Sequence, residues 1–433
     1  MKKQAFAVLT MIALVALLVG GCATPAPPPE PTTPPPAEAT ATTAPPTPTP
    51  APVIGTTYKL GFFSSITGPT SSLGVPERNT AEMIAAQLEE AGGVIGPDGV
   101  IHPVEVIIYD DESNPEVAAT VASRLIEEDE VDAIVGGSGS GPSLACVPLM
   151  QEAEIPYVSM ASSRSIIRNP ETGETYEWCF KTPQENLHSG GWQARYVQDM
   201  GWDQVCDIYS NDGYGQDCLA QTTAAMATNH IEVSYSDSFE PTDTEFPQIA
   251  SVVASGCDAL VIGAVPPGAS LVTVAAREGA PDLPVILGHG VCNAKFIEAA
   301  GEAAEGTVFP CGKLMYADLL LDDDPQKELL LKYREDYMAF TGEGPEGLST
   351  FGGHAYDGLL WAVEAMGSLE EGLDLTARRA AIRDYIETNI TDWPGTGGVF
   401  NITPEDHLGL TYEALGFVKV EGGTWAYFPP EEW

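Results

Sequence analysis

Hydrophobic and polar positions alternate along most of the chain in a pattern typical of an α/β protein. The apolar run Tyr58–Phe63 predicts a first strand, and Glu77–Ala91 has the periodicity of a helix. The Gly92–Gly93 pair is suited to end that helix. Asn114 followed by Pro115 predicts the start of another helix, because asparagine caps helices and proline fits their first position. We therefore predict a parallel sheet with helices on both faces.

The same alternation restarts after the middle of the chain and predicts a second doubly wound unit. Its expected strands are 205–209, 231–235, 259–262, 285–287 and 306–309, and its expected helices are 191–200, 215–229, 246–254, 270–278 and 296–300. Two further predicted helices, 324–341 and 349–366, fit either unit by periodicity alone. The tail from Gly398 onward is expected to form strands.

The first residues have the layout of an export signal. Lys2 and Lys3 precede a short apolar run that ends at Cys22. This resembles a bacterial lipoprotein signal of residues 1–21, cleaved so that the Cys22 sulfur takes up a diacylglycerol. Residues 22–52, almost only Pro, Thr and Ala, predict an extended, disordered linker. We expect a lipid-anchored protein on the extracytoplasmic side, in the periplasm or at the cell exterior.

Charge excludes several partner classes. Asp and Glu total 62 against 19 Lys and Arg, a formal net charge of −43. Such a surface repels nucleic acid and anionic lipid headgroups. We therefore expect no nucleic-acid partner and membrane contact through the lipid anchor only.

Eight cysteines suit an oxidising exterior. Cys206 and Cys257 precede predicted strands, and Cys292 and Cys311 follow them, so both pairs are candidate disulfides. No Cys or His spacing is typical of a structural zinc site. We expect neither a metal nor a cofactor.

Small hydroxyl-bearing loops follow two neighbouring predicted strands. Gly136–Pro142 opens a helix and contains Ser138 and Ser140, and Met160–Ser163 follows the next strand. Ligands of open parallel sheets bind beyond the carboxyl ends of the strands. The first loop matches neither a phosphate-binding P-loop nor a G-x-S-x-G nucleophile elbow. Together the loops predict a cradle for a carboxylate-sized anion, although each alone is also compatible with a simple connection.

In the second unit, candidate site residues follow the strand ends as well. Asp212 and Tyr214 lie in the loop Asn211–Gly215, and His289 lies between two glycines. Tyr214 would offer a ring and a hydroxyl to a ligand. The alternative is structural: the glycines form turns, Tyr214 caps a helix and His289 is solvated.

A set of short motifs, in order along the chain, carries a family resemblance. They are Gly61–Pro69 with Leu73–Gly74, Ala91–Gly96, Tyr109–Pro115, Val135–Gly137, Tyr214–Gly215, Ala304–Gly306 and Ala355–Asp357. The sequence resembles the branched-chain amino-acid-type (leucine/isoleucine/valine-binding-like) solute-binding lipoproteins of ABC importers, which have the type I periplasmic binding protein fold. The resemblance implies two doubly wound parallel-sheet lobes joined by a multi-strand hinge. It places lobe 1 at 53–181 plus 312–394 and lobe 2 at 182–311 plus 395–433.

The resemblance also implies ligand-binding residues. The positions that hold the ligand's carboxylate fall on Ser140, the backbone of Ala161 and Ser163, with Ser138 as a possible addition. Leu73 and Tyr214 fall on positions that contact the ligand. These candidates are Leu73, Ser138, Ser140, Ala161, Ser163, Asp212, Tyr214 and His289.

His289 departs from the family pattern, because it stands on or beside the acidic residue that pairs with the ligand's ammonium. A neutral imidazole does not replace a carboxylate as the partner of a buried ammonium. Either Asp212 substitutes for it, or the ligand is an aromatic or aliphatic carboxylate or an amide. If His289 lines the pocket, affinity is expected to vary between pH 5 and 8, where histidine titrates.

We expect a monomeric binding protein without catalysis that captures a small solute and docks on ABC permease subunits. One alternative is a sensory lipoprotein that signals to a membrane receptor. A second is a secreted hydrolase, for which the sequence offers no nucleophile–base set.

Overall fold

The computed structural model describes residues 53–433, and all structural statements below concern them. The expected signal peptide, the lipidation site Cys22 and the linker to residue 52 lie outside the described residues. Among residues 53–433, no helix has the length and apolar content that a membrane crossing requires.

The first lobe is built on a five-stranded parallel sheet of strand order β4-β1-β5-β6-β7. Its strands are β1 (Tyr58–Ser64), β4 (Val104–Asp110), β5 (Ala133–Gly136), β6 (Tyr157–Ser159) and β7 (Cys179–Lys181). Two short hairpin-like pairs flank it: β2 (Val94–Ile95) with β3 (Ile101–His102), and β13 (Trp393–Pro394) with β14 (Val399–Phe400).

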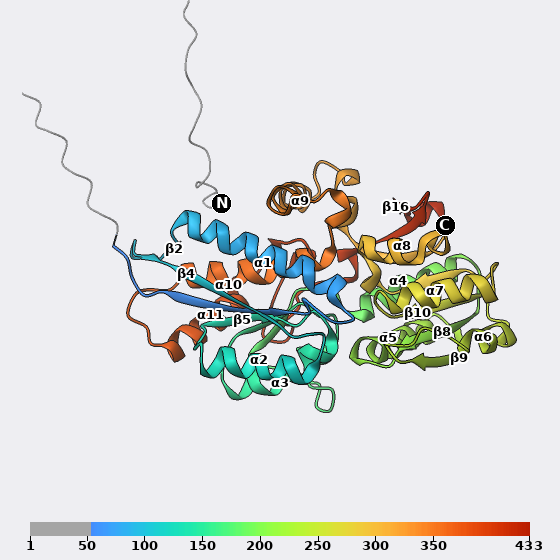
Figure 1. Cartoon of the computed structure of the whole chain (residues 1–433), viewed down its shortest axis with the longest axis horizontal. Helices are drawn as coiled ribbons and strands as arrows, with labels where there is room; N and C mark the ends of the chain where they lie inside the picture. Colours follow the sequence, from blue (N-terminus) through green and yellow to red (C-terminus); the bar gives the residue numbers. More distant parts are fainter. Residues whose placement is uncertain (1–52) are drawn as a thin grey trace, which may run out of the picture. The chain divides into compact units, whose positions relative to one another are not determined.

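Helices cover both faces of this first sheet. They are α1 (Ser71–Ala91), α2 (Pro115–Glu127), α3 (Ser140–Glu152), α9 (Lys327–Thr341), α10 (Thr350–Gly367) and α11 (Leu375–Asn389). Figure 1 shows α1 and α10 on one side of the strands and α2 and α3 on the other. The expected capping of α2 is confirmed, because the Asn114 side chain accepts from the Glu116 N–H at 2.8 Å.

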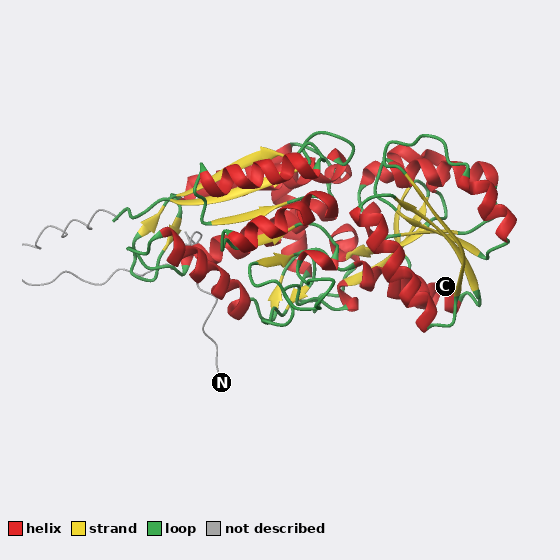
Figure 2. Cartoon of the chain, turned by 90° about the horizontal axis from the view of Figure 1, so that it is seen from below, coloured by secondary structure: helices red, strands yellow, loops and turns green. Residues whose placement is uncertain are grey.

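The second lobe is built on a seven-stranded sheet of order β16-β15-β12-β11-β10-β8-β9. Its strands are β8 (Gln204–Ser210), β9 (Glu232–Phe239), β10 (Ala259–Gly263), β11 (Val285–Leu287), β12 (Val308–Gly312), β15 (Leu415–Glu421) and β16 (Thr424–Tyr427). The last two strands pair antiparallel at one edge, and the others are parallel. Figure 2 shows the strands in two separate groups, each enclosed by helices.

The helices of the second lobe enclose two hydrophobic clusters. They are α4 (Asn186–Asp199), α5 (Gly213–Thr228), α6 (Gln248–Ser255), α7 (Gly268–Gly279) and α8 (Ala294–Ala300). On β10, Leu260 belongs to the cluster with α6 and α7, and its neighbour Val261 to the cluster with α4 and α5. Adjacent residues of a strand face opposite sides, so the clusters lie on the two faces of the sheet.

The C-terminal boundary of the first lobe differs from the predicted one. Residues 395–433 were expected in lobe 2, but Phe400, Ile402, Leu408 and Leu410 belong to the core of the first lobe. Only from β15 onward does the tail pair with the second sheet. Phe400 packs edge-on against Trp361 of α10, with the ring centroids 4.8 Å apart, and strand propensity does not encode such a contact.

Helix α1 begins six residues earlier than periodicity predicted, and Pro76 lies inside it. Its first turn packs against the end of β1. A Cβ atom at Gly74 would lie 2.1 Å from the Ser65 carbonyl oxygen, so only glycine permits this contact. The close approach brings Leu73 to the edge of the sheet.

One of the two candidate disulfides is present: Cys206 and Cys257 are bonded, with their Cα atoms 5.8 Å apart. Cys292 and Cys311 are both buried and free, and the Cys292 thiol donates to the Pro310 carbonyl at 3.3 Å.

Removal of the disulfide should destabilise the second lobe. It closes a loop with a sequence separation of 51 residues, and such a cross-link contributes about 2–4 kcal/mol. We expect the Cys206→Ser/Cys257→Ser variant to lose that much free energy of unfolding in urea titrations. Dithiothreitol should lower the free energy of unfolding of the wild type to that of the variant, and it should leave the stability of the variant unchanged. Equal stability of oxidised wild type and variant would contradict this prediction.

Candidate functional site

A cavity of about 260 Å³ lies where the two lobes meet. It is lined from the first lobe by Pro69, Thr70, Leu73, Ser113, Pro115, Ser138–Pro142, Met160–Ser162, Pro183, Thr350, Phe351 and His354, and from the second by Asp212, Tyr214, Pro241, Val265, His289 and Gly290. Most of these residues follow the carboxyl ends of strands, where ligands of parallel sheets bind. Their side chains are mainly apolar or carry a single hydroxyl group.

The lobes approach each other closely beside the cavity. A Cβ atom at Gly213 would lie 3.2 Å from the Gly141 nitrogen, and the Ser72 hydroxyl donates to the Pro266 carbonyl at 3.4 Å. The N-termini of α3 and α5 therefore face each other, as expected for loops 136–143 and 211–215. A molecule in the cavity would contact both lobes.

The N-terminus of α3 presents unused donors to the cavity. Gly139 caps the helix without a side-chain bond, and the first intrahelical bond runs from Ser143 N–H to Gly139 at 3.1 Å. The N–H groups of Ser140 and Gly141 precede that bond and point out of the helix. The buried Ser140 hydroxyl has no hydrogen-bond partner.

Ser138 lines the same cavity but is already occupied. Its hydroxyl accepts from the Ser65 N–H at 2.8 Å and donates to the Glu77 carboxyl group. Burial raises the pKa of Glu77 well above its usual value, which disfavours the charged form of this carboxyl group. Ser138 therefore supports the loop rather than offering a free hydroxyl.

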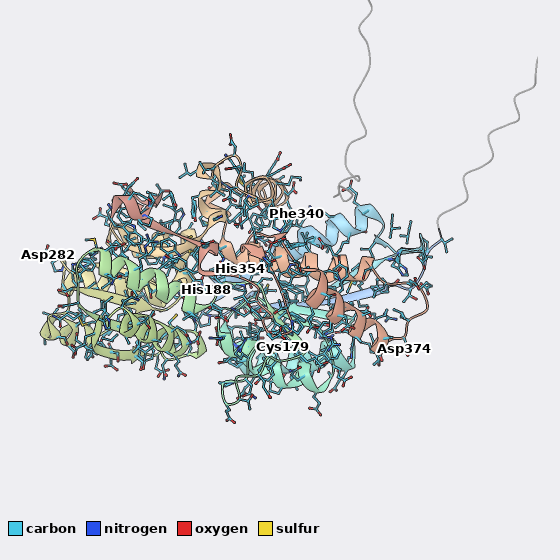
Figure 3. The ribbon with its side chains drawn as sticks, turned by 180° about the vertical axis from the view of Figure 1, so that it is seen from behind. Cys179, His188, Asp282, Phe340, His354 and Asp374 are labelled. Carbon is cyan, nitrogen blue, oxygen red and sulfur yellow. A yellow bond between two sulfur atoms is a disulfide. The ribbon has the colours of Figure 1, made fainter. Side chains whose placement is uncertain are left out.

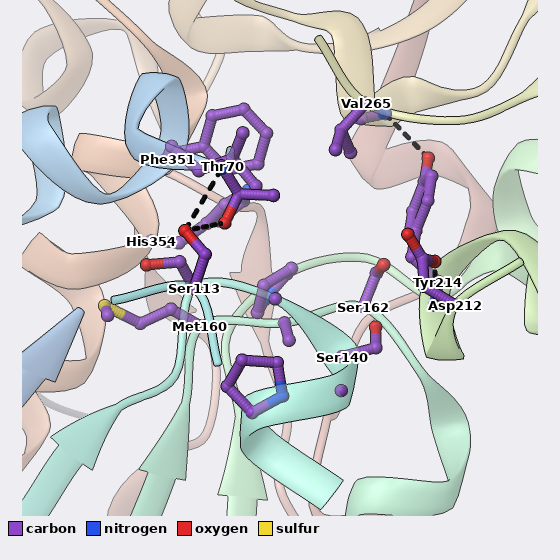
Figure 4. Close-up of a pocket in the computed structure, with 18 of the residues that line it drawn as sticks. Thr70, Ser113, Ser140, Met160, Ser162, Asp212, Tyr214, Val265, Phe351 and His354 are labelled. Carbon is purple, nitrogen blue, oxygen red and sulfur yellow. Dashed lines mark hydrogen bonds between the residues drawn. The ribbon is translucent and has the colours of Figure 1, made fainter. Parts of the chain in front are cut away.

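The loop after β6 departs in detail from the predicted cradle. Ala161 lines the cavity, but its N–H donates to the Ser159 hydroxyl at 3.1 Å. Ser163 is buried and does not line the cavity, whereas its neighbour Ser162 does. Figure 4 shows the hydroxyl groups of Ser140 and Ser162 pointing into the same space, beside Tyr214 and Asp212. The structure thus brings Ser162, not Ser163, to Ser140.

Tyr214 and Asp212 line the opposite side with most of their polar groups engaged. The Tyr214 hydroxyl accepts from the Gly290 N–H at 3.0 Å, so the ring rather than the hydroxyl faces the cavity (Figure 4). Asp212 caps α5 and accepts from the Tyr214 and Gly215 N–H groups, both at 2.9 Å. Asp212 is the only lining residue with a carboxyl group in the part of the chain that the structure describes.

His289 lines the cavity together with His354, which sequence reasoning missed. His289 lies in the short 3-10 helix η2 (His289–Val291), and His354 lies on α10 at the junction of the lobes (Figure 3). They are 7% and 4% exposed, and neither Nδ1 atom has a hydrogen-bond partner. Burial lowers the pKa of both to about 3, so the expected change in affinity between pH 5 and 8 does not follow from His289.

The start of α10 also brings Thr350 and Phe351 to the cavity. A signal was available: Ser349 caps the helix through a bond from the Phe351 N–H at 3.2 Å. That signal predicts where the helix begins in the chain but not where it lies in the fold, because nearly forty residues separate α10 from β12.

Comparisons with known proteins agree with this architecture. A family model described as "Periplasmic binding protein" matches residues 57–424. The leucine-, isoleucine-, valine-, threonine- and alanine-binding protein of Pseudomonas aeruginosa is 21% identical over 294 residues, which cover 67% of this chain and 74% of that protein.

Solved structures share the fold. An extracellular ligand-binding receptor from Rhodopseudomonas palustris aligns with a TM-score of 0.76 at 25% identity, over 86% of this chain and 99% of that one. The branched-chain amino acid transporter substrate binding protein LivJ of Streptococcus pneumoniae, in complex with isoleucine, aligns with a TM-score of 0.70 at 21% identity, over 85% and 97%. Both confirm the expected two-lobed α/β class.

The match to the family model extends over most of the chain and includes both lobes and the loops around the cavity. Proteins of this family bind solutes outside the cytoplasm and are not enzymes, so the hydrolase alternative is excluded. The chain belongs to the periplasmic binding protein family.

Proposed function

We propose that this protein captures a small carboxylate-bearing solute between its two lobes and delivers it to an ABC permease. The single observation that supports the carboxylate most directly is the N-terminus of α3. There, two backbone N–H groups and the partnerless Ser140 hydroxyl face the cavity. Helix N-termini favour anions because their N–H groups are unpaired and the helix dipole is positive at that end.

The relatives support the same class of solute. The Pseudomonas aeruginosa relative is named for binding leucine, isoleucine, valine, threonine and alanine, and the Streptococcus pneumoniae structure holds isoleucine. All of these ligands carry a carboxylate. We propose that the carboxylate lies between Ser140 and Ser162 and that the apolar side chains of Leu73, Met160 and Phe351 contact the rest of the solute.

Release and capture would use hinge bending between the lobes. The connections between the two sheets lie near residues 181 and 312 and in the segment that leads into β15. Because the lobes are in contact beside the cavity, the hinge must open for a solute to enter. We propose that the closed, solute-bound form docks on the permease subunits.

The N-terminal residues support a position at the membrane. The run that ends at Cys22 and the Pro-, Thr- and Ala-rich segment after it are the layout of a lipidated cysteine on a linker. We propose that Cys22 carries a diacylglycerol and that the binding unit 53–433 acts at the end of this tether. Mass spectrometry of the membrane-extracted protein, compared with a Cys22→Ala variant, tests this proposal.

Replacement of Ser140 by alanine should weaken carboxylate binding about tenfold or more. A hydrogen bond to a charged group contributes about 1.5–3 kcal/mol. Isothermal calorimetry with isocaproate, leucine and leucic acid measures the loss for whichever of them binds. Ser236→Ala, an exposed serine on β9, is the matched control and should leave affinity unchanged. Unaltered affinity of Ser140→Ala would remove the α3 N-terminus from the site.

A further inference from the structure

Two buried imidazoles, one from each lobe, meet in the cavity with unused nitrogen atoms. His289 comes from the second lobe and His354 from the first. Each is more than nine-tenths buried, and each Nδ1 lacks a hydrogen-bond partner. Buried polar atoms in folded proteins are nearly always paired, so two orphaned nitrogens in one binding cavity point to a group that the solute supplies.

Both imidazoles are neutral, and their surroundings keep them so. Burial is the main cause of the low pKa of each, and the ammonium of the buried Lys181 lowers both further. Lys181 itself donates to the Pro183 carbonyl at 2.9 Å. His188, a further neighbour of His289, also has a low pKa, about 4, mainly through burial. This end of the cavity therefore has a positive charge nearby and two uncharged rings at its surface.

A neutral imidazole carries one ring proton, so one of its nitrogens donates and the other accepts. The unpaired Nδ1 atoms of His289 and His354 therefore need a solute group with hydrogen-bonding capacity of its own. A group that can both donate and accept suits such a pair of rings best.

A buried ammonium is a poor donor for this place. Asp212 is the only lining carboxylate in residues 53–433, and its Oδ1 already accepts two N–H bonds at the start of α5. Burial raises the pKa of the Glu77 carboxyl group behind Ser138, which disfavours its charged form. The Lys181 ammonium would repel a second cation. An amino group at the two imidazoles would thus meet neutral rings and a nearby cation, and only Asp212 would offset its buried charge.

We propose that His289 and His354 together bind an uncharged hydroxyl group of the solute, so that the ligand is a hydroxy acid rather than an amino acid. A hydroxyl group both donates and accepts, so it can pair with a donor nitrogen of one ring and an acceptor nitrogen of the other. A carbonyl cannot donate, and an ammonium cannot accept. This inference rests on the proposed carboxylate-binding function and specifies its ligand class.

Calorimetry with two matched series of acids tests the proposal. The first series is leucic acid, isocaproate and leucine, which place hydroxyl, hydrogen or ammonium beside the carboxylate. The second is δ-hydroxyvalerate, valerate and δ-aminovalerate, which place the same groups at the far end of the chain. In at least one series, the hydroxy acid should bind at least tenfold more tightly than both partners.

Two variants attribute this preference to the histidines. His289→Leu and His354→Leu should each reduce the preference for the hydroxy acid over its unsubstituted partner to about twofold or less. Binding of the unsubstituted acid, measured in parallel for each variant, provides the reference for this ratio. The second variant keeps the test available if the first does not fold, as judged by circular dichroism. Wild-type affinity for the hydroxy acid should also be flat between pH 5 and 7, because both rings stay neutral there and Lys181, with a pKa of about 8, stays charged.

The failures of the two proposals are distinguishable. If none of the six acids binds, the carboxylate-binding function itself is wrong. If unsubstituted or amino acids bind as tightly as hydroxy acids, or if both histidine variants keep the full preference, only the hydroxyl inference is overturned. An affinity that changes between pH 5 and 7 in wild type and not in His289→Leu would mean that the imidazole binds in its charged form, which also overturns it.

Discussion

Replacing Asp357 with alanine should lower the free energy of unfolding by about 3–5 kcal/mol. The fully buried carboxyl group of this α10 residue accepts three hydrogen bonds from the loop after β13: from the Thr396 N–H at 2.7 Å, the Thr396 hydroxyl at 3.0 Å and the Gly397 N–H at 2.8 Å. Alanine would leave two backbone donors buried without an acceptor, and each such group costs about 1–3 kcal/mol. Urea titration measures the loss.

The same substitution should also weaken the contacts at the connection between the two lobes. Gln184 donates to the Gly397 carbonyl and Gln326 to the Gly395 carbonyl, so the loop that Asp357 holds contacts the first segment that crosses between the lobes.

Asp357→Asn, which keeps one acceptor oxygen, should be intermediate in stability. Asp384→Ala, an exposed aspartate on α11, is the control and should change stability by no more than about 0.5 kcal/mol. A loss below about 1 kcal/mol for Asp357→Ala would contradict the expected role.

Asp207→Asn should stabilise the protein at alkaline pH and not at acidic pH. Asp207 lies on β8, is 1% exposed, and neither carboxylate oxygen has a hydrogen-bond partner. Burial raises its pKa to about 7 from 3.8. Between these two values the folded state holds a proton that the unfolded state has lost. The contribution of the protonated Asp207 to the free energy of unfolding is therefore fully present below pH 4, and it is lost as the pH rises through 7.

The asparagine variant removes this pH dependence, because its side chain stays neutral. At 1.36 kcal/mol per pKa unit, the gain should approach about 4 kcal/mol above pH 8 and vanish near pH 4. Urea titrations at both pH values measure it. Asp282→Asn, in an exposed loop of the same lobe (Figure 3), is the control and should show no such difference. A gain that is equal at both pH values would indicate a packing effect instead.

Local sequence patterns predicted most of the secondary structure correctly. The short apolar runs became strands β1, β10 and β11, and Asn114 with Pro115 marked the first turn of α2. These patterns work because burial on a sheet face and capping of a helix end depend on residues that are neighbours in the chain. They were less informative for β7 and α11, which were not predicted. β7 has only three residues, and α11 is a mostly polar helix with few buried positions.

Site residues were predicted where a single loop contains the recognisable pattern. They were missed where segments far apart in the chain come together. Ser140, Leu73, Tyr214 and His289 were all placed in one cavity by the structure. Which of their polar atoms are free to bind a solute was less predictable, because that depends on the hydrogen-bond partner that each atom finds in the folded protein. The Tyr214 hydroxyl is engaged by Gly290, and the Ala161 N–H by Ser159.

By itself, the sequence determined the alternating strands and helices, the two α/β units, the family and the small hydroxyl-rich loops at the strand ends, because all of these are written in short segments. Only the tertiary structure decided that residues 399–410 complete the first core, that Ser162 rather than Ser163 faces the cavity, and that His354 joins His289. The physical reason is that hydrogen-bond partners, burial and the resulting protonation states are properties of contacts between residues far apart in the chain. Both imidazoles are neutral here because each is buried in the cavity between the two lobes.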